Sequence, residues 1–230
     1  MINRDKCCIC NENIIPLMEL PNYPISFTMS STKNFKFETL SFGNCKNCNN
    51  IQLNKLVDVK ELYTNKPHNN EVIGKTWTNH FMAFKNFITS INNNLQHVIE
   101  IGCPTNKLLK LFNNYDSWTL LDPNALTYDT ENILSINSYF DLSFNISNKY
   151  NTIINSHLLE HLYFPNEQLL RFNDLLLDNG DLFISVPNME YYAKTHSPFL
   201  GIHFEHTYYL NVVNIIYLLN KNNFYIKNML

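Results

Sequence analysis

The second half of the chain alternates short apolar runs with segments whose apolar residues recur at helical spacing. From about residue 96 this alternation predicts an α/β fold, with a mainly parallel sheet and helices on both of its faces. The apolar runs predict strands over 97–101, 117–121, 132–136, 151–155, 181–186 and 223–229. The periodic segments predict helices over 105–113, 125–130, 166–177 and 211–220.

Residues 55–95 are expected to be mainly helical. The stretch HFMAFKNFITSI has a core-facing stripe at helical spacing, made of Phe81, Phe84, Phe87, Ile88 and Ile91. The polar stretch before it, LYTNKPHNNEVIGKTW, is typical of a linker or flap. Because such segments often contact substrates, Tyr63 and His68 are candidate substrate-contacting residues.

The first 55 residues contain two C-x-x-C pairs, Cys7 with Cys10 and Cys45 with Cys48. Four thiolates in two short turns suit a tetrahedral Zn²⁺, and a closed Cys₄ shell stabilises a fold without leaving a position for a reacting water. The long gap between the pairs predicts an excursion in which Pro21 and Pro24 break regular structure. Cys8 and Cys103 are left out of the predicted metal site.

Composition is that of an ordinary globular protein, with 45% hydrophobic and 16% charged residues and a formal net charge of −3 over 230 residues. The charge argues against a nucleic-acid partner. Neither a membrane span nor a signal peptide is evident, so a cytoplasmic location is expected, with cysteines serving as metal ligands or free thiols. The expected organisation is a zinc-binding module over 1–55, a helical linker or flap over 56–95, and the α/β domain over 96–230.

Ligands of parallel sheets bind at the carboxyl ends of the strands, which here are Gly102, Asp122, 155–157 and 187–188. The loop after the first of these strands, in VIEIGCPTNKLLKLF, contains a single glycine. Pro104 and Asn106 stand where nucleotide-binding loops usually have further glycines, and asparagine tolerates positive φ better than most residues. Compared with such loops, Asn106 is expected to replace a glycine, while Pro104 is expected to shift or weaken the bound ligand or to abolish its binding.

Six motifs follow one another in a recognisable order: the four cysteines followed by QL, then VIEIGC, LLDP, HLLEHLYFP, LLLDNGDLFISVPN and HFEHTYYL. In this order they resemble class I S-adenosylmethionine-dependent methyltransferases with an N-terminal zinc-binding domain, a subgroup related to sugar C-methyltransferases. The resemblance implies a Rossmann-like domain, S-adenosylmethionine as cofactor and a structural Zn²⁺. It also implies a small-molecule acceptor such as a nucleotide-linked sugar or another surface-polysaccharide precursor.

The resemblance also implies roles for residues at the strand ends. Glu100 and Gly102 would lie beside the methionyl end of the cofactor, and Asp122 would bind the ribose hydroxyls. A simple turn ahead of Pro123 is the alternative reading of Asp122. The further cofactor-side candidates are Cys103, Pro123, Ser156 and His157.

In the related sugar methyltransferases a Glu-His pair faces the acceptor, and it corresponds here to Glu205 and His206. A neutral histidine suits proton removal because its pKa lies near working pH. His203 stands where the family often has a tyrosine, which suggests a different acceptor. The stretch HLLEH also matches the inverted zinc-peptidase pattern, but that chemistry needs a helix, and Glu160 and His161 are expected to anchor the loop instead.

The usual fold would add a final antiparallel strand after NNFYIKNML, and related enzymes add a further domain. A truncated chain or a small family member would both fit, and O-, N- and C-methylation stay open. Two hypotheses follow: a methyltransferase acting on a small polar acceptor, and a catalytically silent methyltransferase-like binding module with a structural zinc.

Overall fold

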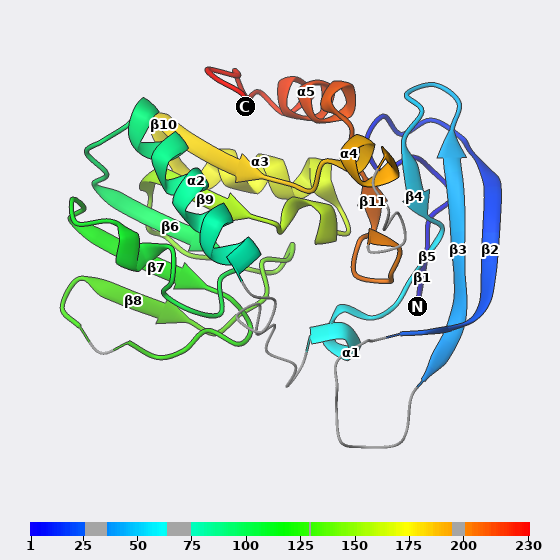
Figure 1. Cartoon of the computed structure of the whole chain (residues 1–230), viewed down its shortest axis with the longest axis horizontal. Helices are drawn as coiled ribbons and strands as arrows, with labels where there is room; N and C mark the ends of the chain where they lie inside the picture. The colour runs from blue at the N-terminus through cyan, green and yellow to red at the C-terminus, as the bar shows by residue number, and fades with distance from the viewer. Residues whose placement is uncertain (26–35, 64–74, 129, 195–200) are drawn as a thin grey trace. The chain divides into compact units, whose positions relative to one another are not determined.

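The computed structural model describes the chain except for residues 26–35, 64–74, 129 and 195–200. The described chain forms two compact units (Figure 1). The cysteine unit consists of Met1–Tyr63, Leu159–Leu170 and Val186–Leu230, and the sheet unit of Thr64–Leu158 and Arg171–Ser185. The domain boundaries expected from the sequence stay a prediction.

The sheet unit is built on five parallel strands, counted over the described residues, in the order β10-β9-β6-β7-β8. In this order the chain reverses direction across the sheet between β6 and β9, which makes their carboxyl ends the expected ligand crevice. This confirms the predicted Rossmann-like fold class. The strands are β6 (His97–Ile101), β7 (Ser117–Leu121), β8 (Ile133–Ile136), β9 (Tyr150–Ser156) and β10 (Leu176–Ser185).

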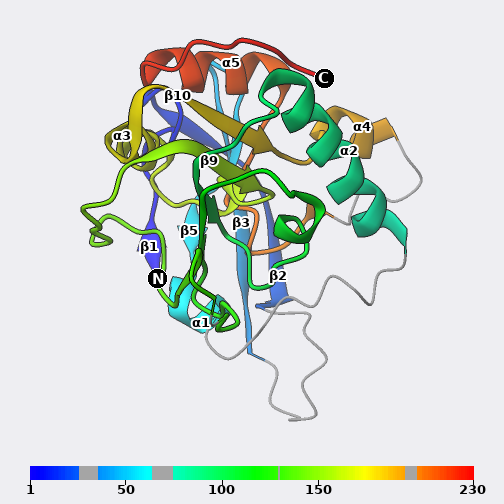
Figure 2. The same cartoon turned by 90° about the vertical axis from the view of Figure 1, so that its left-hand side faces the viewer.

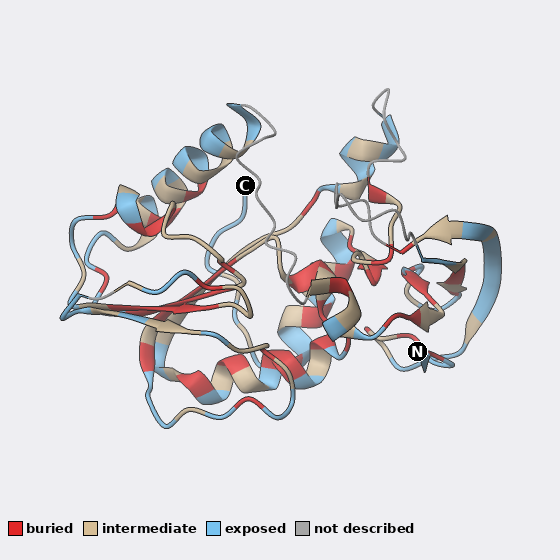
Figure 3. Cartoon of the chain, turned by 90° about the horizontal axis from the view of Figure 1, so that it is seen from below, coloured by how far each residue is buried: buried red, intermediate tan, exposed pale blue. Residues whose placement is uncertain are grey.

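Helices flank this sheet because their apolar stripes pack against its branched side chains. Figure 2 shows α2 (Lys75–Ile91) and α3 (Pro165–Leu175) on opposite sides of β9 and β10. Phe84 and Ile88 of α2 are buried in a core with residues of the strands, as the stripe predicted. Figure 3 shows the buried residues of this sheet in red.

Two predicted helices of the sheet unit are wrong. Residues 105–113 form only a 3₁₀ turn, η2 (Leu109–Leu111), and residues 125–130 are not helical where they are described. The backbone carbonyls of Ala125 and Leu126 accept hydrogen bonds from the side chains of Asn137 and Ser135, both at 2.8 Å, in place of helical partners. The predicted strand over 223–229 is also absent from the described structure.

The cysteine unit contains an antiparallel sheet of four strands among the described residues, in the order β11-β4-β3-β2. Its strands are β2 (Ile14–Pro24), β3 (Phe37–Cys45), β4 (Ile51–Leu53) and β11 (Tyr208–Tyr209), and β1 (Ile2–Asn3) pairs separately with β5 (Lys55–Leu56). The expectation that Pro21 and Pro24 break regular structure is met only in part: Pro21 lies within β2, where the register is irregular, and Pro24 is the last residue of the strand. An edge strand tolerates proline, and the register shifts between Leu20 and Tyr23, where Asn22 has a φ of 52°.

Aromatic and aliphatic residues from distant parts of the sequence share the core of this unit. Leu40, Phe42 and Leu53 pack in one buried cluster with Tyr163 and Phe204. The remaining elements of the unit are short: α1 (Val59–Tyr63), η3 (Leu159–His161), α4 (Met189–Lys194) and α5 (Val212–Lys221). Among the described helices, none has the length and apolar character needed to cross a membrane.

Candidate active site

The glycine that follows β6 has a conformation and an environment that other residues would not tolerate. Gly102 has a φ of +83°, and a Cβ at this position would lie 3.0 Å from Cβ of Leu158. Its N–H donates to the carbonyl of Leu121 at 2.8 Å, which joins the end of β6 to the end of β7. The positive φ and the close packing of Leu158 therefore explain why glycine stands at this point, at the carboxyl edge of the sheet.

Asp122 directly follows β7, next to this glycine in the sheet. Its Oδ1 accepts the N–H of Asn124 at 2.7 Å, and its own N–H donates to the carbonyl of Ile136 at 3.2 Å. The turn described by the alternative reading is thus present, with Pro123 inside it. The half-buried carboxylate still lies at the edge where a ribose would be bound, so the two readings are compatible.

The loop after Gly102 needs no second glycine. Asn106 does not have a positive φ, so the expectation that it replaces a glycine is wrong. Its carbonyl accepts the N–H of Lys110 at 3.0 Å, and its N–H donates to the hydroxyl of Tyr128 at 3.1 Å. Pro104 contributes its carbonyl, which accepts the N–H of Leu126 at 3.0 Å. These hydrogen bonds stabilise the loop, and after Gly102 its described residues need no positive φ.

Glu100, within β6, lies inside the core of the sheet unit. The side chain is 4% exposed and accepts a hydrogen bond from Nε1 of Trp118 at 3.1 Å. Burial raises the pKa of Glu100 to about 8, although the Trp118 hydrogen bond acts in the opposite direction. The Sγ of Cys103, which is also buried, donates to the carbonyl of Glu100 at 3.2 Å. Their predicted roles beside the methionyl end stay predictions.

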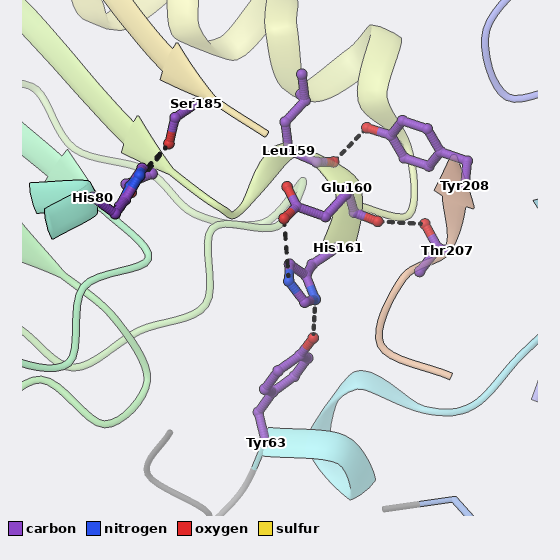
Figure 4. A network of polar contacts seen from close by, with 9 residues as sticks. Tyr63, His80, Leu159, Glu160, His161, Ser185, Thr207 and Tyr208 are labelled. Carbon is purple, nitrogen blue, oxygen red and sulfur yellow. Dashed lines mark hydrogen bonds and ion pairs between the residues drawn. The ribbon is translucent and has the colours of Figure 1, made fainter. Parts of the chain in front are cut away.

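A polar and aromatic cluster lies at the carboxyl ends of β9 and β10. Nε2 of His80, from α2, lies 2.9 Å from Oγ of Ser156, and Oγ of Ser185 donates to Ser156 at 3.2 Å (Figure 4). His157 has a φ of 52°, and its ring centroid lies 4.8 Å from that of His80 and 5.0 Å from that of Trp77. Burial, and next His157, lower the pKa of His80 to about 4, so this ring is neutral at physiological pH.

The cysteine unit holds a second group of ionisable residues. The hydroxyl of Tyr63 lies 2.8 Å from Nδ1 of His161, and Nε2 of the same ring lies 3.8 Å from Oε1 of Glu160 (Figure 4). Glu160 is only 3% exposed. In the tautomer with its proton on Nε2, that proton faces the carboxylate and Nδ1 accepts the tyrosine hydroxyl proton; in the other tautomer Nδ1–H donates to the tyrosine oxygen.

His206 belongs to the same group. One ligand atom each of Glu160, His161 and His206 lie within 4.8 Å of one another. The ring centroid of His206 lies 4.9 Å from that of His161 and 4.0 Å from that of His203. Three of the four predicted catalytic residues, Tyr63, His203 and His206, therefore gather here. The carboxylate of Glu160 lies in the same group, and the predicted role of Glu205 stays a prediction.

The inverted zinc-peptidase pattern has no helical framework. His157 follows β9 in a left-handed conformation, and His161 ends the 3₁₀ turn η3. The expectation that Glu160 and His161 anchor the loop stays a prediction, and both residues also lie in one group with His206. His68 lies outside the described residues.

The two C-x-x-C pairs adopt the same local structure. The N–H of Asn11 donates to the carbonyl of Cys7 at 2.9 Å, and the N–H of Asn49 donates to that of Cys45 at 2.8 Å. Asn11 and Asn49 both have a positive φ, 65° and 56°, directly after the second cysteine of their pair. Each pair thus forms a tight knuckle that turns its two thiols to one side.

The four thiols of the knuckles converge on a single point. Sγ of Cys7 lies 3.6 Å from that of Cys48, and Sγ of Cys10 lies 3.4 Å from that of Cys45. All four sulfurs lie within 4.8 Å of one another. A tetrahedral zinc with Zn–S bonds of about 2.3 Å requires sulfurs about 3.8 Å apart. The donor set therefore fits such an ion, and Cys8 stays outside it.

Sequence patterns alone missed several residues of these groups. His80 and Trp77 lie in α2, where the apolar stripe was the only pattern that gave a prediction. Glu160 and His161 carried a usable signal, because an ionisable pair closely follows β9, at the edge where ligands bind.

Comparison with known families gives one match that covers most of the chain. A family model described as a methyltransferase domain matches residues 77–227. Comparison with curated protein sequences gives no match.

Two solved methyltransferase structures are similar to this chain at low sequence identity. The plantazolicin methyltransferase BpumL, in complex with a triazolic desmethylPZN analog and SAH, is 13% identical with a TM-score of 0.51, over 66% of this chain and 65% of BpumL. The N-methyltransferase NodS from Bradyrhizobium japonicum WM9, in complex with S-adenosyl-L-homocysteine, is 18% identical with a TM-score of 0.41, over 46% of this chain and 60% of NodS. The chain thus spans less than two thirds of each of these two proteins.

Proposed function

Because this chain belongs to the family of methyltransferase domains, we propose that it transfers a methyl group from S-adenosylmethionine to a small polar acceptor, a nucleotide-linked sugar or another polysaccharide precursor. The observation that carries the cofactor assignment is that Gly102 and Asp122 directly follow two neighbouring parallel strands, β6 and β7. Gly102 forms the left-handed turn at the end of β6, and Asp122 offers a carboxylate for ribose hydroxyls at the end of the neighbouring strand, on the edge where the strand order places a ligand.

The cofactor, when bound, supplies an electrophilic methyl group on a sulfonium. The acceptor must lose a proton as its electron pair forms the new bond to the methyl carbon and the carbon–sulfur bond breaks. His206 takes that proton in our proposal, because it lies among ionisable side chains and can act as a neutral imidazole.

The neighbours of His206 support this role by their arrangement. Tyr63 holds the ring of His161 at Nδ1, which directs Nε2 of that ring to the buried carboxylate of Glu160. The fixed His161 ring packs beside His206 and so restricts its orientation. A group of histidine, tyrosine and carboxylate side chains favours an acceptor with several hydroxyl groups over an apolar one. Glu205 is proposed to bind one of these hydroxyls.

The four cysteines are proposed to hold a structural Zn²⁺. The fit of the sulfur spacing to a tetrahedral shell supports this assignment. Since four protein ligands complete the shell, the ion would have no part in methyl transfer and would stabilise the knuckles.

The acceptor class is tested by transfer of a radiolabelled methyl group from S-adenosylmethionine to a panel of nucleotide sugars, with peptides and free amines as comparison acceptors. The proposal expects label in nucleotide sugars with the wild-type chain and its loss with His206→Ala. Label in peptides or amines alone would show that the acceptor class is wrong while leaving the methyltransferase activity in place.

A further inference from the structure

Arg4, a buried arginine near the N-terminus, bonds to two segments of the chain. One contains Glu160 and His161, and the other contains His206. The side chain of Arg4 is 9% exposed. Its Nη1 donates to the carbonyl of Thr207 at 2.7 Å, and its Nη2 donates to the carbonyl of Tyr163 at 2.6 Å. Nη2 also lies 3.5 Å from the carbonyl of Leu162 and 3.3 Å from Oγ1 of Thr207. All of these acceptors are neutral oxygens.

The two segments bonded by Arg4 are already joined to each other. The N–H of Thr207 donates to the carbonyl of Glu160 at 2.9 Å, and Oγ1 of Thr207 donates to the carbonyl of Leu162 at 2.8 Å. The hydroxyl of Tyr208 donates to the carbonyl of Leu159 (Figure 4). Thr207 directly follows His206, so the backbone position of His206 relative to Glu160 depends on these bonds.

The chemistry of this position requires an arginine. The guanidinium is planar, and its fixed fork can bond one carbonyl on each segment at the same time. A lysine ammonium is a single point of charge and cannot bridge the two carbonyls in the same way. The N–H of Arg4 donates to the carbonyl of Asn54 at 2.8 Å, which fixes the base of the side chain.

We propose that Arg4 is a positioning residue that holds the segments Leu159–Tyr163 and Phe204–Tyr208 together and thereby sets the orientation of His161 and His206. The inference rests on the proposed function, since it assigns those histidines to the acceptor side. Arg4 acts through the backbone of both segments and does not itself contact the acceptor.

The test compares the chain with Arg4→Met and Arg4→Lys, using ¹⁵N- and ¹³C-labelled histidine and amide hydrogen exchange. Single His161→Gln and His206→Gln variants assign the ring signals among the eight histidines. In both Arg4 variants the ring signals of His161 and His206 are expected to move, and exchange of the Thr207 amide to accelerate at least about 10-fold. The ring of His97, in the sheet unit, is the internal control.

A matched control is Lys221→Met, which removes a cation whose Nζ donates to the carbonyl of Ile9 at 2.9 Å in the same unit. It should leave both ring signals and the Thr207 amide unchanged. Unchanged signals in Arg4→Met, even with a lowered melting temperature, would overturn the positioning role. If Arg4→Met does not fold, Arg4→Lys gives the same decision. Absence of S-adenosylmethionine binding by the wild-type chain would instead refute the proposed function. The histidine signals can be measured without the cofactor, so the two tests fail independently.

Discussion

The hydroxyl of Tyr63 and Nδ1 of His161 lie 2.8 Å apart, although the two residues are 98 positions apart in the sequence. This contact gives His161 a fixed ring orientation beside His206, and it brings together a residue of the expected flap and one of the turn after β9. The contributions of these side chains to methyl transfer can be measured by single substitutions.

His206→Ala should lower methyl transfer by about 10²- to 10⁴-fold and leave S-adenosylmethionine affinity nearly unchanged, because loss of a base affects the transition state. Tyr63→Phe should have a smaller effect, since it removes only the bond that orients His161. Turnover and cofactor affinity are measured separately on each variant. The control is His97→Ala, which removes an exposed imidazole from the sheet unit. Full turnover by His206→Ala would refute the role of His206.

Metal analysis of the purified chain should give about one zinc per molecule, as a Cys₄ shell requires. Cys45→Ser should lose the ion and destabilise the cysteine unit, which includes residues 186–230 as well as the N-terminal block. Cys8→Ser is the matched control, because Cys8 lies outside the four-sulfur group. A metal-free wild-type chain, prepared without chelator, would remove the zinc assignment.

The free energy of unfolding should depend on the ionisation of Glu100. The pKa of Glu100 in the folded chain, about 8, lies above its ordinary value of 4.5, so the fold favours the protonated form. The contribution of Glu100 to the free energy of unfolding is fully present below about pH 4.5. It decreases by a few kcal/mol as the pH rises towards 8. Glu100→Gln should abolish this loss while keeping an acceptor for Trp118.

Denaturant unfolding at pH 5 and pH 8 measures the effect. The stability difference between the two pH values should shrink in Glu100→Gln and persist in the control Glu131→Gln, which changes an exposed acid of the same unit. An identical difference in wild type and Glu100→Gln would show that Glu100 is ionised throughout.

Pro104→Gly should not tighten cofactor binding. The described loop needs positive φ only at Gly102, so a second glycine relieves no strain. The substitution should instead destabilise the chain by about 0.5–1 kcal/mol, because glycine increases the entropy of the unfolded state. Calorimetry and thermal unfolding decide between these effects, and a clearly tighter complex would restore the view that Pro104 impairs the site.

Local patterns predicted those elements whose structure is determined locally. Mainly apolar runs such as HVIEI and SWTLL place strands correctly, since a parallel strand buried on both faces lacks the polar alternation of a half-exposed strand. The C-x-x-C spacing likewise predicted which four sulfurs converge. The expected membership of class I S-adenosylmethionine-dependent methyltransferases is confirmed by the family match and by the strand order.

The failures involve bonds between distant residues. The carbonyls of Ala125 and Leu126 are bonded by side chains of Asn137 and Ser135, and a periodicity argument does not contain those partners. From the sequence alone Arg4 cannot be told from a surface cation, because the Thr207 carbonyl that it bonds lies more than 200 positions later. The grouping of Glu160 with His206 was missed for the same reason.

The central claim, that this chain binds S-adenosylmethionine at the carboxyl edge of its parallel sheet, is tested most directly by calorimetry with S-adenosylmethionine on the wild-type chain and on Asp122→Ala. We expect binding by the wild type and a loss of about 1–3 kcal/mol of binding free energy in Asp122→Ala, from charge-assisted hydrogen bonds to the ribose. The control Asp116→Ala, which changes an exposed acid at the opposite end of β7, should bind as the wild type does. No detectable binding by a folded wild-type chain would contradict the account and favour a silent methyltransferase-like module.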